Sequence, residues 1–169
     1  KYMPLGVLSI AACIPDIHEV KVLDASSLGL TIDETIEEIE SFGPDILGLS
    51  VVTYRAWQMT EILNRTTAPF KAVGGPHTTH NYMSIAKQGA DAIFVGDAEI
   101  TFAKWIGDGC PSGIFFGNAI ALDSLPLPAR ELVNLRDYEI GKNNDLLFDV
   151  GKLRLPMYSS KGCPLKCVY

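Results

Sequence analysis

Two cysteines near the end of the printed sequence, Cys163 and Cys167, are spaced for binding a metal centre. The three residues between them exceed the two of a zinc knuckle or a thioredoxin-type motif, which argues against both of those sites. An iron–sulfur cluster takes thiolates from a loop, and a C-x-x-x-C-x-x-C loop leaves one iron open for a further ligand. The third cysteine of that loop would follow directly after Tyr169. The pair therefore predicts two ligands of a cluster.

A second group of residues suited to ligand binding stands where three apolar runs of the sequence end. These residues are Ser50, Val52 and Thr53 after the first run, Gly74, Gly75 and His77 after the second, and Gly96 and Glu99 after the third. In open α/β sheets, ligands bind at the carboxyl ends of the strands. Paired glycines let the backbone approach a ligand closely, and a hydroxyl can hydrogen-bond a polar group. The three ends together are the candidate ligand site.

Each of these residues also has a purely structural interpretation. The glycine pair can form a tight turn, Thr53 can cap a helix, and His77 can be an ordinary loop histidine. Glu99 suits the first turn of a helix because the helix macrodipole favours a negative charge there. The two isolated cysteines, Cys13 and Cys110, are expected to be buried or inert thiols.

Helices and strands are expected to alternate through the first two thirds of the chain. The helices are expected over 4–14, 31–43, 79–88 and 98–109, with one more beginning at Thr53, and the strands over 18–25, 45–52, 70–75 and 90–96. Such alternation with short loops is typical of a parallel sheet with helices on both faces. The fold class is therefore α/β, a flavodoxin-like doubly wound sheet whose first strand is missing or lies upstream of Lys1.

The character of the sequence changes near Gly113, which suggests three units. We expect an α/β domain over 1–112, an extension and interdomain linker over 113–153, and the truncated start of a further domain over 154–169. Two prolines, Pro126 and Pro128, exclude a helix across the linker at that point. A missing first strand would expose a sheet edge, so a homodimer of this piece is a further expectation.

Composition limits the classes of partner. The 169 residues carry a formal net charge of −6 without a run of Lys and Arg, which argues against nucleic acid as a partner. A hydrophobic fraction of 47% argues for a folded domain. No apolar run has the length of a membrane span, and the first residues lack the pattern of a signal peptide. Together with sparse cysteine, these features predict a cytoplasmic location.

Five motifs in order give a resemblance to a known family. They are PLGVLSIAA, PDILGLSVVT, AVGGPHTT, LPLPAR and SSKGCPLKCVY. The series resembles the N-terminal cobalamin (B12)-binding domain of radical SAM proteins, in the group that includes anaerobic magnesium-protoporphyrin IX monomethyl ester cyclases. The resemblance covers nearly the whole chain.

The resemblance implies cofactors and roles for matching residues. Ser50, Val52, Gly74 and Gly75 would line the groove for the corrinoid's nucleotide tail, His77 and Thr79 would lie at its mouth, and Cys163 and Cys167 would bind a [4Fe–4S] cluster. In the full-length protein that cluster would hold S-adenosylmethionine, and the enzyme would carry out methyl transfer or oxidative cyclisation at an unactivated carbon. The partner would be the radical SAM barrel of the same polypeptide.

The sequence departs from the family pattern at several positions. Asp97 and Ala98 stand where Glu and Gly are common, Lys161 replaces a frequent Arg, and the third cluster cysteine is absent. The piece alone is therefore expected to be catalytically inactive, with exposed, mobile and metal-free Cys163 and Cys167. The pair Asp16 and His18 does not form a corrinoid D-x-H-x-x-G loop, because Lys21 stands where that motif has glycine.

Two other functions remain open from the sequence. The same fold without a corrinoid could be a docking domain for the radical SAM barrel, and retention of cobalamin separates the two. A receiver or flavodoxin module is disfavoured, because a receiver needs an acidic cluster at its strand ends, where this sequence has Ser50 and the glycine pair.

Overall fold

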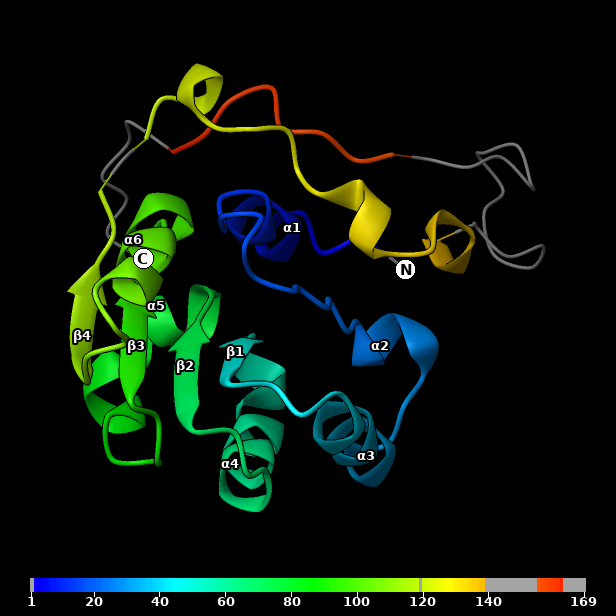
Figure 1. Cartoon of the computed structure of the whole chain (residues 1–169), viewed down its shortest axis with the longest axis vertical. Helices are drawn as coiled ribbons and strands as arrows, with labels where there is room; N and C mark the ends of the chain where they lie inside the picture. Colours follow the sequence, from blue (N-terminus) through cyan, green and yellow to red (C-terminus); the bar gives the residue numbers. More distant parts are fainter. Residues whose placement is uncertain (1, 119, 139–154, 163–169) are drawn as a thin grey trace.

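The core of the protein is a parallel sheet of four strands. The structure, a computed structural model, describes residues 2–118, 120–138 and 155–162. The strands β1 (Ile46–Ser50), β2 (Phe70–Gly74), β3 (Ala92–Val95) and β4 (Gly113–Phe116) lie side by side in the order β1-β2-β3-β4, and every pair is parallel (Figure 1). The predicted α/β class with a parallel sheet is confirmed. β4 extends the sheet into the segment after residue 112.

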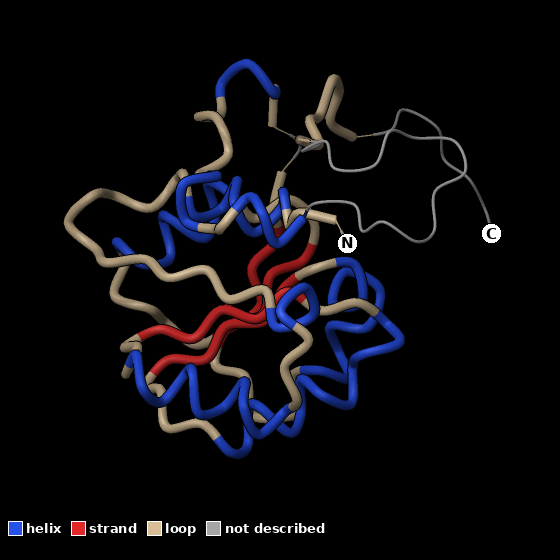
Figure 2. The backbone as a smooth tube through the Cα atoms, turned by 90° about the vertical axis from the view of Figure 1, so that its right-hand side faces the viewer, coloured by secondary structure: helices blue, strands red, loops and turns tan. Residues whose placement is uncertain are grey.

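Helices cover both faces of this sheet, as Figure 2 shows from the side. One face packs against α3 (Ile32–Phe42), α4 (Ala56–Arg65) and α5 (Pro76–Ile85), and the other lies under α1 (Leu5–Ala11) and α6 (Glu99–Gly107). A short helix, α2 (Ala25–Leu28), follows α1. Within the described part of the chain, no helix is long and apolar enough to cross a membrane.

The start and end of α3 follow directly from local sequence. The Thr31 hydroxyl accepts a hydrogen bond from the Glu34 N–H at 3.2 Å, and the Glu34 carboxylate accepts one from the Thr31 N–H at 2.8 Å. Together the two bonds form the predicted capping box. Gly43 ends the helix with φ +63°, a left-handed conformation that glycine adopts without steric cost.

The prediction of a strand over 18–25 is wrong. Residues 19–24 are extended but belong to no strand, and Ala25 already begins α2. Val22 packs toward α1, whereas its neighbour Leu23 packs toward α3, as expected for a segment that is covered on both faces. A strand also needs a hydrogen-bonding neighbour. Among the described residues this segment has none, because a groove separates it from β1.

Two helix starts differ from expectation. Thr53 makes no side-chain cap and instead opens a 3-10 turn, Thr53–Arg55, that precedes α4. The helix expected from residue 79 starts three residues earlier at Pro76, where proline suits a first turn because its missing N–H has no helical partner.

Residues 122–138 pack onto α1 through short 3-10 turns. Tyr138, 4% exposed, joins Met3, Leu5 and Leu8 in one apolar cluster. The Ala129 N–H also donates a hydrogen bond to the Leu8 carbonyl at 3.1 Å. This segment therefore holds α1 in place over the sheet.

Replacing Tyr138 by Phe is expected to lower the free energy of unfolding by about 1.5–3 kcal/mol at pH 8, the usual contribution of a hydrogen bond to a charged group. The Tyr138 hydroxyl donates to the Asp24 carboxylate at 3.0 Å, and burial together with this carboxylate raises the pKa of Tyr138 to about 12. A raised pKa in the folded state means that this stabilisation is complete below the usual value near 10 and is lost as the pH rises toward 12.

Urea unfolding at pH 8 and at pH 11 measures this difference. The wild-type protein should lose more stability than Tyr138→Phe between the two pH values. Parallel losses in both proteins would contradict the role assigned to the hydroxyl.

Candidate functional site

On the face of the sheet that lies under α1 and α6, the strands β1 and β2 carry only small side chains. The register of the strands places Gly48 opposite Ala72 and Ser50 opposite Gly74. A Cβ atom on Gly48 would lie 3.7 Å from the Phe102 ring of α6, which identifies this face. Because alternate residues of a strand point to opposite faces, the larger Leu47, Leu49 and Val73 side chains point to the other side. The result is a hollow where a core would otherwise be.

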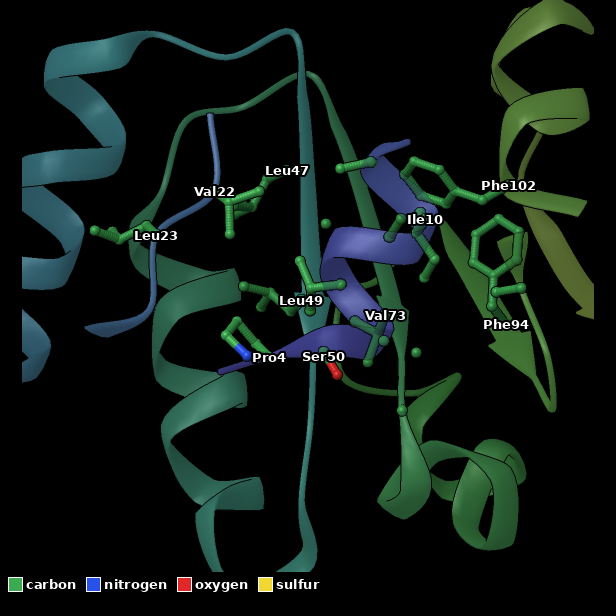
Figure 3. Close-up of a pocket in the computed structure, with 18 of the residues that line it drawn as sticks. Pro4, Ile10, Val22, Leu23, Leu47, Leu49, Ser50, Val73, Phe94 and Phe102 are labelled. Carbon is green, nitrogen blue, oxygen red and sulfur yellow. The ribbon is translucent and has the colours of Figure 1, made fainter. Parts of the chain in front are cut away.

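This hollow is a groove of about 1120 Å³ between the sheet and α1. The small residues Gly48, Ser50, Ala72 and Gly74 form the floor of this groove. Ile10 of α1 and Phe102 of α6 also line it (Figure 3). The groove continues sideways to the extended segment 19–24. Part of its volume therefore lies beside the open edge of β1, and part lies over the floor of small residues.

The carboxyl end of the floor depends on an unusually close approach of two chain segments. Gly75 has φ +99° and ψ 179°, a conformation almost restricted to glycine. A Cβ atom there would lie 2.7 Å from the Val51 nitrogen and 2.9 Å from its oxygen. The Val51 N–H donates to the Gly74 carbonyl at 2.9 Å, and the Val51 carbonyl accepts from the His77 N–H at 3.0 Å. These bonds join the ends of β1 and β2.

Thr79 joins the second and third strand ends. Its hydroxyl donates to the Gly75 carbonyl and accepts from the Gly96 N–H, both at 3.2 Å. The threonine thus holds two of the three predicted strand ends together without lining the groove itself.

A buried acidic residue, Glu99, follows the end of β3. Glu99, the first residue of α6, is 4% exposed and forms an ion pair with Lys161. Its Oε2 atom has no hydrogen-bond partner among the described residues. Asp97 lies on the same loop, with its Oδ1 atom 3.6 Å from the Lys161 Nζ atom.

The isolated cysteines carry no sign of reactivity. Burial raises the pKa of the Cys13 thiol, and the nearby Glu99 carboxylate raises it further. Burial also raises the pKa of the Cys110 thiol. Both groups are therefore protonated and weakly nucleophilic at neutral pH, in agreement with the expectation of inert thiols.

The predicted site residues divide into two sets. Those that line the groove are Ser50, Val52, Gly74, Gly75, Gly96 and Glu99. The groove lining does not include Thr53, His77 or Thr79; instead His77 Nδ1 lies 3.3 Å from Thr53 Oγ1. The binding roles of all these residues stay predictions. Cys163 and Cys167 lie outside the described residues, so their exposure and metal content also stay expectations.

Sequence reasoning missed Gly48, Ile10, Phe102 and Lys161, which also line the groove. A signal for Gly48 was available, because it stands two residues before Ser50 in the same strand and so shares its face. Lys161 carried no local signal, since its partner Glu99 is 62 residues away.

Comparisons with known proteins show the family to which the chain belongs. Residues 1–106 match the family described as B12 binding domain. Three curated relatives each align with 98% of the chain: the uncharacterized methyltransferase PH0819 of Pyrococcus horikoshii (26% identical), cytidylyl-2-hydroxyethylphosphonate methyltransferase of Streptomyces wedmorensis (24%) and the uncharacterized methyltransferase sll1242 of Synechocystis (24%). The chain spans 40%, 43% and 28% of their respective lengths. Since the family match covers more than half of the chain, this protein belongs to the B12-binding domain family.

Proposed function

We propose that the groove under α1 binds the nucleotide tail of a corrinoid, and that the chain is the cobalamin-binding part of a larger methyl-transferring enzyme. The observation that carries this proposal is the floor of Gly48, Ser50, Ala72 and Gly74, which leaves space where a sheet normally packs against a helix. The family match to residues 1–106 supports the identity of the ligand.

The residues of the groove suit such a tail. Its base is flat and apolar, and a floor without large side chains offers it contact with the backbone of β1 and β2. Its ribose and phosphate are polar, and the exposed Ser50 hydroxyl at the carboxyl end can hydrogen-bond them. When bound, cobalamin supplies a cobalt centre that carries a methyl group between donor and acceptor. The protein contributes binding, orientation and exclusion of water.

The wider enzyme is proposed to be a radical SAM protein. The C-x-x-x-C pair supports a [4Fe–4S] cluster that holds S-adenosylmethionine in the longer polypeptide. The names of the three relatives favour methyl transfer over the oxidative cyclisation of the magnesium-protoporphyrin group. The radical SAM barrel would then be the partner that faces the corrinoid.

Retention of hydroxocobalamin tests the proposal. The wild-type protein, after incubation and desalting, is expected to keep a corrinoid absorption spectrum. Gly74→Trp should retain at least tenfold less, because the indole would occupy the groove above the floor. Gly107→Trp is the matched control, since Gly107 has open space around it and does not line the groove. Circular dichroism verifies that each variant is folded.

A folded wild-type protein that retains no cobalamin would contradict the proposal and favour the docking domain. Equal retention by Gly74→Trp and Gly107→Trp would place the ligand elsewhere.

A further inference from the structure

A segment late in the chain returns to the carboxyl edge of the sheet. Residues 155–162, here called the return segment, are drawn in red in Figure 1 and run past α1 toward α6. Four of them, Tyr158, Ser160, Lys161 and Gly162, line the groove together with the end of β1 and the loop before α6. The return segment therefore forms part of the wall of the proposed corrinoid site.

One contact holds the return segment to the start of α6. The Lys161 ammonium donates a hydrogen bond to the Glu99 carboxylate and also lies near Asp97. The side chains of Lys161 and Glu99 are only 13% and 6% exposed. Removing the lysine from a buried ion pair of this kind is destabilising, because it leaves a buried carboxylate without its counter-charge. The second Glu99 oxygen has no hydrogen-bond partner among the described residues, so no other group in that part of the chain would take the place of the lysine.

A second contact restrains the other end of the return segment. The Arg130 Nη2 atom donates to the Pro156 carbonyl oxygen at 2.7 Å. Arg130 follows Ala129, whose N–H is bonded to Leu8 of α1. The return segment is thus held at two points, one connected to α1 and one to α6, and these are the two helices that cover the groove.

We propose that Lys161 is a positioning residue that fastens the return segment over the groove, so that the segment closes one side of the ligand site. The inference rests on the proposed function in that the ligand is taken to be a corrinoid. Asp97 contributes the second negative charge to this contact.

Limited proteolysis without any ligand tests the fastening directly. Chymotrypsin can cleave after Tyr158 once the return segment detaches, and cleavage of a transiently opened state follows the population of that state. Lys161→Ala is expected to be cleaved there at least tenfold faster than wild type, whereas Lys161→Arg, which keeps the charge, should stay within about twofold. Lys104→Ala is the matched control, because Lys104 pairs with Asp108 at the exposed end of the same helix, α6. Equal cleavage of wild type and Lys161→Ala overturns the inference.

Titration with hydroxocobalamin then tests the closing of the site. Lys161→Ala should bind at least tenfold more weakly than wild type, with Lys161→Arg restoring affinity and Lys104→Ala leaving it unchanged. Faster cleavage combined with unchanged affinity overturns the role of the segment as a wall of the site. If wild type binds no cobalamin while Lys161→Ala still shows faster cleavage, the proposed function fails and the fastening role of Lys161 is supported.

Discussion

Gly75→Ala is expected to lower the free energy of unfolding by about 3 kcal/mol. The backbone conformation at Gly75, φ +99° and ψ 179°, costs roughly 1–3 kcal/mol for any residue with a Cβ atom. The new methyl group would also lie 2.7 Å from the Val51 nitrogen, so β1 and β2 must separate at their ends. Separation weakens two hydrogen bonds of Val51, each contributing about 1 kcal/mol.

Urea unfolding of Gly75→Ala and of Gly107→Ala measures this effect against a matched glycine. Gly107 ends α6 with no atom within 4 Å of a built Cβ, so alanine there should raise stability by up to about 1 kcal/mol. Cobalamin retention should fall only in Gly75→Ala, because the strand ends that it displaces border the groove. If Gly75→Ala lost less than about 1 kcal/mol of stability, the close approach of Gly75 to Val51 would not be rigid.

Gly48→Val is expected to have opposite effects on stability and on ligand binding. Valine suits the pleated surface of a strand, and glycine inside a strand costs roughly 0.5–1 kcal/mol, so the free energy of unfolding should rise by about that amount. The Cβ atom itself would make only ordinary contact with the Phe102 ring at 3.7 Å. Its methyl groups must then project into the groove, and cobalamin affinity should fall at least tenfold, or about 1.4 kcal/mol.

The two measurements are thermal unfolding without ligand and titration with hydroxocobalamin. If Gly48→Val is more stable but binds cobalamin more weakly, the loss of affinity cannot be due to unfolding. A destabilising variant would not allow this distinction. Gly107→Ala again serves as control, with a small gain in stability and unchanged affinity. Unchanged affinity of Gly48→Val would mean that the floor of small residues is not the surface on which the corrinoid lies.

Local sequence was sufficient where the interacting groups are close in the chain. The α3 helix could be predicted from Thr31, Glu34 and Gly43 because a capping box and a left-handed glycine act within a few residues. The apolar runs at β1, β2 and β3 were predicted for the same reason, since a strand covered on both faces needs a continuous apolar sequence. The segment 18–25 was predicted as a strand from its apolar residues Val20, Val22 and Leu23, yet a strand also requires a neighbour, which local sequence does not reveal.

The sequence by itself determined the alternation of helices and strands, the parallel sheet and the three strand ends at which a ligand could lie. These properties depend on hydrophobic periodicity and turn residues, which are local. Only the tertiary structure decided that Gly48, Ser50, Ala72 and Gly74 share one hollow face, because the register of two strands joins residues 24 positions apart. It also decided that Lys161 pairs with Glu99 and that Thr79 joins two loops, since long-range ion pairs and hydrogen bonds depend on how the chain packs.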